Sequence, residues 1–276
     1  MCRKYLAVFL MIVVLLSACG HDAPTTAPTT VPITLPSSAP VTTATTDSTT
    51  IPTTEPTTEP TTVPAVVHSG LYLEGVDVED VIRYFNEVVL SAEISNGGNA
   101  ALVQKWVQQI NYWIGGDPTE WDRVVLEGFA ETLNGIDGFP GMVQTEIEAD
   151  STMNIYFCDA QTLQDRMGSD FAGGDYEGAV TFWYNGDNEI FNAKICVRSD
   201  IFQIYRNSVI LEEIYNGLGP VQDTVWREDS IIYQHGSEVQ SLSEIDLLIL
   251  KLLYHPDIHC GMNADECEAV IRSLYY

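Results

Sequence analysis

The chain has 276 residues and a formal net charge of −27, from 39 acidic and 12 basic side chains. This charge argues against binding to nucleic acid or to anionic lipid headgroups, because both are themselves negatively charged. It favours cationic partners or loosely bound cations.

The N-terminal segment has the form of a bacterial lipoprotein signal. A basic start is followed by an apolar run over residues 5–16, which is too short to span a bilayer comfortably. The sequence LSAC at residues 16–19 resembles a lipobox, and this resemblance implies cleavage after residue 18 and lipid attachment to Cys19. The alternative is an ordinary secretory signal with an incidental cysteine. We expect Cys19 to anchor the protein on the extracytoplasmic face of the cell membrane.

Residues 19–66 are dominated by Thr and Pro, with TTEPTTEPTT as the clearest repeat. Such a segment has little apolar surface to bury and is expected to stay disordered. Proline keeps it extended, so it would reach on the order of 140 Å. We interpret it as a stalk, with a simple linker as the alternative. Residues 67–276 then form one globular domain of ordinary size.

The first half of this domain is predicted to alternate helices and strands, and the second half to be helical. The apolar periodicities predict helices at 78–88, 117–133, 200–217, 245–254 and 264–274, and strands at 105–114, 143–149, 153–158, 179–184 and 189–197. Residues 161–167 are expected to form a short polar helix or a turn. The last two strands flank Asn185-Gly186-Asp187 and are expected to form a hairpin. The fold class is therefore α/β (α+β), with a mixed sheet and a long helix in the N-terminal half and a helical C-terminal half.

Three helix starts carry recognisable capping residues. Asp117 precedes Pro118 at the start of the long helix, which is a favoured combination. Capping boxes are predicted at the next two helices. They pair Asp200 with Gln203 and Ser241 with Glu244.

Residues 206–232, RNSVILEEIYNGLGPVQDTVWREDSII, indicate an amphipathic helix with a glycine stop, followed by a loop and an apolar turn. Zinc proteases of the metzincin type place H-E-x-x-H-x-x-G-x-x-H at such a helix, with a methionine-containing turn after it. On that template Glu213 takes the position of the catalytic glutamate and Gly219 that of the glycine. The histidine and methionine positions are occupied by Glu212, Asn216, Gln222 and Ile232.

Together with LSEIDLLILKLLYHPDIHCGM further along, these segments resemble an uncharacterised metzincin-like domain family of bacterial secreted proteins and lipoproteins. Members of that family have E-E-x-x-Q/N-x-L-G in place of the zinc-binding helix motif. The resemblance covers most of residues 70–262. It implies a metzincin-like fold and a peptidase-like ancestry, with the helix of residues 245–254 following the turn.

The chemistry of the replaced positions argues against a zinc centre. Zn²⁺ takes imidazole, thiolate or carboxylate ligands at about 2.0 to 2.3 Å. Glu212 meets this requirement, whereas the amides of Asn216 and Gln222 are poor zinc ligands. We therefore expect no zinc and no zinc-dependent catalysis.

Other chemistry at this place remains open. Glu212, Glu213 and Asp223 with a neighbouring amide suit Ca²⁺ or Mg²⁺ better than Zn²⁺. Adjacent carboxylates also raise one another's pKa, which would make Glu213 a general base. His235 follows the turn and is placed near the same cleft. The alternative is that the two adjacent glutamates are one solvated and one hydrogen-bonded residue.

The cysteines and the remaining histidines offer further sites. Exported chains with an even number of cysteines favour disulfides, and we predict the pairs Cys158–Cys196 and Cys260–Cys267. Zinc ligation by four cysteines is the weaker alternative, since no C-x-x-C pair occurs. A metal set at His255, Asp257 and His259 is disfavoured because Pro256 interrupts a helix there.

The sequence thus predicts a lipid-anchored extracellular module that is non-catalytic and binds a peptide, protein or cell-wall ligand in its former cleft. A hydrolase with a non-standard site around Glu212 and Glu213 is the first alternative. A surface structural protein is the second.

Overall fold

The computed structural model describes residues 10–13, 71–91, 102–168, 171–236 and 238–276. All of them belong to one unit of the chain, residues 1–19 together with 68–276. Cys19, the predicted stalk and the predicted signal peptide other than Leu10–Val13 lie outside the described residues. Within the described residues, no helix has the length and apolar character needed to cross a membrane.

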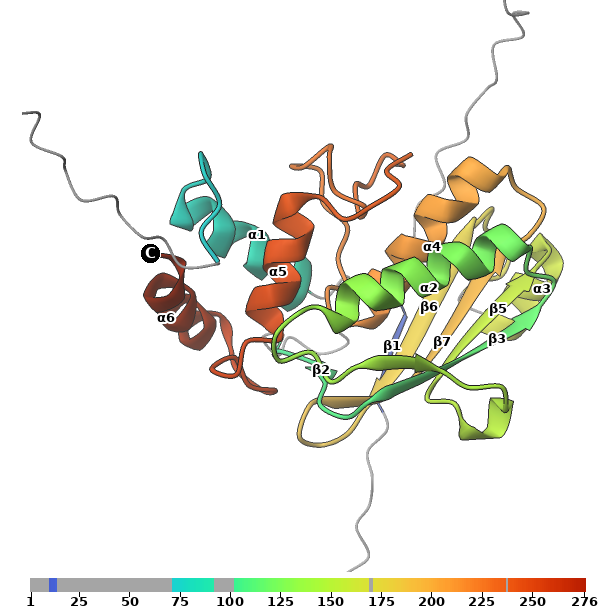
Figure 1. The fold of residues 1–276 in the computed structure, drawn as a ribbon, viewed down its shortest axis with the longest axis horizontal. Coiled ribbons are helices and arrows are strands. Elements are labelled where there is room, and N and C mark those ends of the chain that lie inside the picture. Colours follow the sequence, from blue (N-terminus) through green and yellow to red (C-terminus); the bar gives the residue numbers. More distant parts are fainter. Residues whose placement is uncertain (1–9, 14–70, 92–101, 169–170, 237) are drawn as a thin grey trace, which may run out of the picture. The chain divides into compact units, whose positions relative to one another are not determined.

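The strands of the described residues form one mixed sheet. They are β1 (Leu10–Val13), β2 (Lys105–Trp106), β3 (Ile110–Gly116), β4 (Met142–Gln144), β5 (Met153–Cys158), β6 (Gly178–Tyr184) and β7 (Glu189–Arg198). Their order is β1-β6-β7-β5-β3-β4, with β2 also paired to β7 (Figure 1). The pairs among β2, β3, β4, β5 and β7 are parallel, whereas β6 is antiparallel to β7 and to β1. The predicted mixed sheet and the hairpin are therefore confirmed.

The helices follow the predicted division between the two halves. They are α1 (Val78–Leu90), α2 (Glu120–Asn134), α3 (Ala160–Met167), α4 (Gln203–Gly217), α5 (Glu244–Leu253) and α6 (Ala264–Tyr275). The long α2 connects β3 to β4, and after β7 the described chain continues with helices and loops alone. The helical C-terminal half is confirmed.

Two predicted strands are shorter than expected. The segment from residue 105 to 114 is divided into β2 and β3, because β2 pairs with β7 while β3 pairs with β4 and β5. The strand predicted to reach Ala149 ends at Gln144. The Thr145 hydroxyl then accepts a hydrogen bond from the Ile147 backbone N–H, and this turn ends the pairing.

The three predicted helix caps were wrong by a few residues. The N-cap of α2 is Thr119, which forms a capping box with Asp122. Helix α4 begins after Phe202 without a side-chain cap. At α5 the capping box joins Ser243 to Asp246, whereas the prediction paired Ser241 with Glu244.

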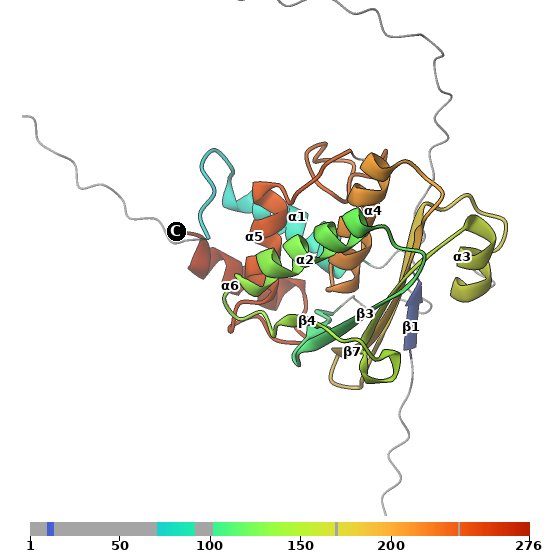
Figure 2. The ribbon, with the colours of Figure 1, turned by 45° about the vertical axis from the view of Figure 1, so that its right-hand side comes forward.

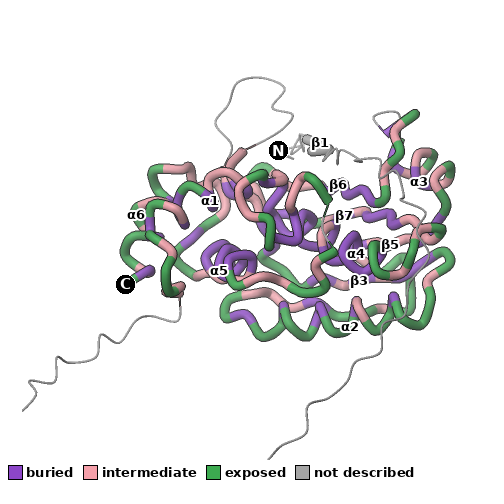
Figure 3. Tube along the Cα trace, turned by 90° about the horizontal axis from the view of Figure 1, so that it is seen from above, coloured by how far each residue is buried: buried purple, intermediate pink, exposed green. Residues whose placement is uncertain are grey.

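The two faces of the sheet carry separate apolar clusters. Ile155 and Phe157 of β5 belong to the main core beneath α2 and α4, while Cys158 belongs to a second cluster beneath α3. Figure 2 shows α3 on the opposite side of the sheet from α2 and α4. Helix α4 is nearly all buried, whereas the outer side of α2 is exposed (Figure 3).

Candidate functional site

Helix α4 is buried along most of its length and carries Glu212, Glu213 and Asn216 of the candidate site. From Arg206 to Gly217 every residue except Glu212 is buried. The predicted amphipathic helix is thus enclosed on nearly all sides, which requires its polar side chains to be accommodated inside the protein.

The glycine stop of this helix has a steric cause. Gly219 has φ of +130°, and a Cβ there would lie 2.4 Å from the carbonyl oxygen of Gln104. The last carbonyls of the helix are bonded from elsewhere, since Trp106 Nε1 donates to the Gly217 oxygen at 2.9 Å and the Tyr254 hydroxyl to the Leu218 oxygen at 2.8 Å. A larger residue at position 219 would not allow this ending.

The side chain of Glu213 is buried against the first residue of β6. A Cβ on Gly178 would lie 2.4 Å from Glu213 Oε1, so the carboxyl group fits there only because the strand opens with glycine. The residue is completely buried, and among the described residues neither of its carboxyl oxygens has a hydrogen-bond partner. Burial, and then the neighbouring carboxylates of Glu212 and Asp223, raises the pKa of Glu213 well above its ordinary value.

Glu212 is half-buried and lies among the same acids. Burial, and then the carboxylates of Asp223 and Glu177, raises the pKa of Glu212 well above its ordinary value. The structure therefore brings together four acidic residues from the start of β6, from α4 and from the loop after it. We call Glu177, Glu212, Glu213 and Asp223 the acid cluster.

The amides of Asn216 and Gln222 are placed differently from each other. Asn216 is fully buried, and both of its side-chain polar atoms lack a hydrogen-bond partner within the described part of the chain. Gln222 is half-buried. Nowhere in the described ranges do three or more His, Cys, Asp or Glu side chains form a group that could hold a metal ion. The raised pKa values of Glu212 and Glu213 favour proton holding by these two side chains.

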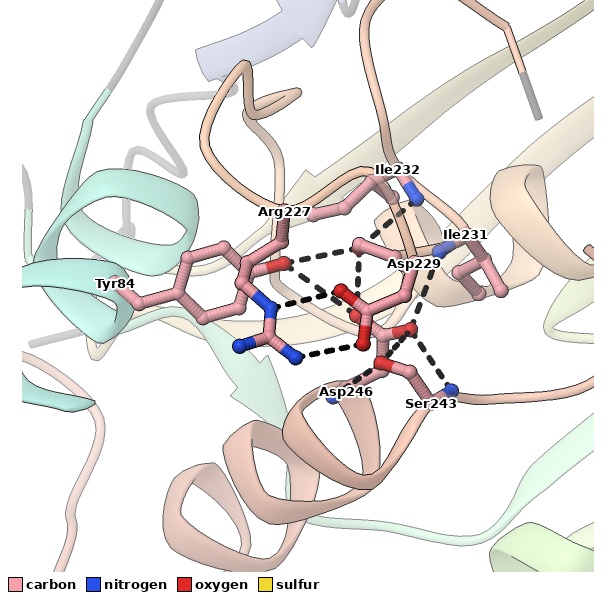
Figure 4. A network of polar contacts seen from close by, with 8 residues as sticks. Tyr84, Arg227, Asp229, Ile231, Ile232, Ser243 and Asp246 are labelled. Carbon is pink, nitrogen blue, oxygen red and sulfur yellow. Dashed lines mark hydrogen bonds and ion pairs between the residues drawn. The ribbon is translucent and has the colours of Figure 1, made fainter. Parts of the chain in front are cut away.

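The turn after α4 is held by a buried carboxylate. Asp246 of α5 accepts hydrogen bonds from Ser230 Oγ at 2.6 Å, from the Ile231 backbone N–H at 3.1 Å and from Ser243 Oγ at 2.8 Å. Tyr84 of α1 donates to Ser230 Oγ at 2.9 Å, which ties a third helix to the same point (Figure 4). This network fixes the turn that contains the buried Ile232.

The histidines do not converge on the acid cluster. His235 is exposed, and its ring contacts Tyr233 at a centroid distance of 5.4 Å. His259 is exposed, and His255 accepts a hydrogen bond from the backbone N–H of Asp257.

A buried ion pair fixes the start of α4. Arg206 Nη1 lies 3.1 Å from Asp122 Oδ2 of α2, and the same guanidinium also donates to the carbonyls of Ser199 and Ile201. This ion pair joins the start of α4 to the first turn of α2.

All four cysteines of the described residues are free thiols, so neither predicted disulfide is present. Cys158 and Cys196 lie on the same face of adjacent strands, but the register pairs Cys196 with Tyr156. The two thiols interact with each other, and this interaction raises the pKa of Cys158 and lowers that of Cys196. Cys260 instead donates to the Lys105 carbonyl at 3.7 Å, and Cys267 is buried on α6.

Glu177, Gly178 and Asp246 were not identified from the sequence as residues of this site. Glu177 carries no local signal that marks it. Gly178 has a recognisable signal, because a glycine at the start of an otherwise apolar strand marks a close approach. Asp246 was missed because Ser243 and Asp246 match the capping pattern as well as Ser241 and Glu244 do.

Comparison with known proteins places the chain in a family. No curated protein matches the sequence. A family model described as "Protein of unknown function (DUF2927)" matches residues 78–273, from the start of α1 almost to the end of α6. The chain therefore belongs to the DUF2927 family of proteins of unknown function.

Proposed function

We propose that the domain is a lipid-anchored, extracytoplasmic binding module that takes up an extended peptide along the outer edge of β6. It is built on a metzincin-like frame that has lost its zinc ligands. The order of α4, its glycine stop, the turn at Ile232 and α5 supports this relation.

One observation carries the proposal, namely that β6 already accepts an added strand. Leu10–Val13 pairs with β6 in antiparallel register, with Leu10 opposite Tyr184 and Val13 opposite Thr181 (Figure 1). If residues 1–18 are removed as the sequence predicts, the edge of β6 loses this neighbour. An open strand edge presents unpaired N–H and C=O groups, which bind extended peptides by strand addition.

The exposed Glu177, next to the first residue of β6, gives this edge a charge preference. A peptide that runs as β1 does passes Tyr184 first and continues past Thr181 toward Gly178, against which Glu213 is packed. Glu177 precedes Gly178 and lies near Glu212. The preferred ligand is therefore an apolar extended segment followed, on its C-terminal side, by Lys or Arg.

The test uses residues 19–276 with Cys19→Ser and synthetic peptides with a Leu-Met-Ile-Val core. Two lysines after the core should bind at least about fivefold more tightly at low salt than two glutamates. In an added strand, the N–H groups of alternate residues point toward β6. N-methylation of these residues removes the donors and should weaken binding by more than about tenfold. N-methylation of the other residues should have little effect, and equal tolerance at every position would contradict strand addition.

The rival hydrolase is tested with the same protein. Metal content and cleavage of the bound peptides are measured for the wild type and for Glu213→Ala. Stoichiometric metal together with cleavage that is lost in the variant would overturn the non-catalytic proposal. Peptide binding without cleavage in either protein would support it.

A further inference from the structure

A cavity of about 560 Å³ lies on a different part of the domain from the β6 edge. Its walls come from β2, from the β6–β7 hairpin and from the segment after α5. The residues that matter most are Lys105, Trp106, Asp187, Glu189, Tyr254 and Cys260. No member of the acid cluster lines the cavity. Its volume is that of a site for a small molecule, for which about 300–1,000 Å³ is typical.

The cavity contains a buried cation. Lys105 is 8 % exposed, and its Nζ donates to the carbonyl oxygens of Leu253 at 2.8 Å and Ile258 at 2.5 Å. Burial lowers the pKa of Lys105 to about 8. In the described part of the chain, these two carbonyls leave one of the three ammonium hydrogens for another acceptor.

Two carboxylates lie on the hairpin side of the same cavity. Glu189 Oε2 accepts a hydrogen bond from Asn185 Nδ2 at 2.9 Å, which fixes its orientation. Burial raises the pKa of the Cys260 thiol, and the Glu189 carboxylate adds to this effect, so Glu189 lies near Cys260. Asp187 is more exposed and lies two residues before Glu189.

The Lys105 ammonium and the Glu189 carboxylate have other hydrogen-bond partners. Lys105 donates to carbonyl groups, and Glu189 accepts from an amide. Stabilisation of the last carbonyls of α5 explains why a cation lies beneath Leu253. It does not explain the two carboxylates of Glu189, which is the strand partner of Lys105, and Asp187.

The floor of the cavity is rigid. Trp106 and Tyr254 are each 2 % exposed, and their polar atoms donate to the carbonyls at the end of α4. The apolar surface that a ligand can reach includes the exposed side chain of Val107. A fixed cavity with a few oriented charges is typical of a pre-formed small-molecule site.

We infer that this cavity is a second binding site, specific for a basic amino acid or a dipeptide that carries one. The ligand carboxylate meets Lys105, its ammonium groups meet Glu189 and Asp187, and its methylene chain packs on Val107. This site is independent of the peptide edge at β6, because the two share no residue.

The test is calorimetric titration of the full-length chain with three probes. L-lysine carries both kinds of charge, 1,5-diaminopentane lacks the carboxylate, and hexanoate lacks the ammonium groups. L-lysine should bind at least about tenfold more tightly than either of the others, since a charge-assisted hydrogen bond is lost in each. No heat of binding for L-lysine at millimolar concentration overturns the inference, as does equal affinity for all three probes.

Two variants locate the site. Glu189→Gln keeps the shape of the side chain and should weaken L-lysine binding at least about tenfold, while Glu148→Gln on an exposed turn should leave it unchanged. Lys105→Met should abolish the preference for L-lysine over 1,5-diaminopentane. If Lys105→Met does not fold, Glu189→Gln decides alone. Unchanged affinity in Glu189→Gln overturns the assignment.

Discussion

The carboxyl group of Glu213 packs directly against Gly178, 35 positions earlier in the chain, and this contact sets the position of α4 over the start of β6. A Cβ on Gly178 would also lie 2.5 Å from Val209 Cγ1. The strand and the helix approach each other here more closely than any side chain larger than glycine allows.

Gly178→Ala should therefore destabilise the protein by about 1–3 kcal/mol, because it overpacks the contact between α4 and β6. The measurement is urea unfolding of the single variant, of Glu213→Ala and of the double variant. The double variant should be more stable than the sum of the single effects predicts, since the smaller residue makes room for the methyl group. Gly128→Ala is the matched control, because no atom lies within 4 Å of a Cβ there. It should stabilise α2 by about 0.5–1 kcal/mol.

The buried acid at Glu213 also predicts a dependence of stability on pH. Its raised pKa means that the folded protein holds the proton more tightly than the unfolded chain does. Its contribution to stability is full at low pH, and is lost as pH rises from the ordinary glutamate pKa toward the raised one. The loss has a slope of up to about 1.4 kcal/mol per pH unit.

Glu213→Gln removes this titrating group without changing the shape of the side chain. The difference in unfolding free energy between about pH 5 and about pH 8 should shrink in this variant, and its stability at the higher pH should not fall below that of the wild type. An unchanged difference, or a marked loss of stability at the higher pH, would show that the carboxyl group is charged and stabilising.

The sequence predicts the elements well and their contacts less well. The strand Met153–Cys158 was predicted to the residue, because a continuous apolar run gives a clear signal. The starts of α2 and α5 were misplaced because several polar residues near each start are acceptable caps. The start of α4 was misplaced because this helix has no side-chain cap. At α5 the choice depends on Ser230, which lies in a different segment and bonds to Asp246.

For the candidate site too, local features could be predicted from the sequence, whereas contacts between distant segments could not. The position of Glu213 on a helix that ends in glycine follows from the local sequence. Its burial against Gly178 and its grouping with Glu177 depend on how β6 folds back beside α4. Cys158 and Cys196 are free thiols that interact with each other across adjacent strands, a proximity that follows from the pairing of β5 with β7.

The ion pair between Arg206 and Asp122 should contribute strongly, because both side chains are buried. Asp122→Asn leaves the guanidinium without its counter-charge and should cost about 3–5 kcal/mol in chemical unfolding. Asp80→Asn removes the partner of Arg83 in an exposed pair and should cost less than about 1 kcal/mol. Equal effects of the two substitutions would contradict the role of the buried pair.

The turn after α4 should depend on Ser230, which joins Tyr84 to Asp246. Ser230→Ala should cost about 1–3 kcal/mol, because the Asp246 carboxylate loses a buried donor. It should also speed limited proteolysis between Arg227 and His235. Ser273→Ala, on an exposed face of α6, should change neither quantity by a measurable amount. Unaltered proteolysis in Ser230→Ala would mean that the backbone alone holds the turn.

The most direct test of the peptide edge compares two forms of the chain for binding of the lysine-containing Leu-Met-Ile-Val peptide. Residues 1–276 with Cys19→Ser retain β1, whereas residues 19–276 with the same substitution lack it. The shorter form should bind at least about tenfold more tightly, because β1 competes for the edge of β6. Ile12→Pro in the longer form, which disrupts β1 pairing, should restore binding. Equal affinity in all three proteins would contradict the assignment of the β6 edge as the binding site.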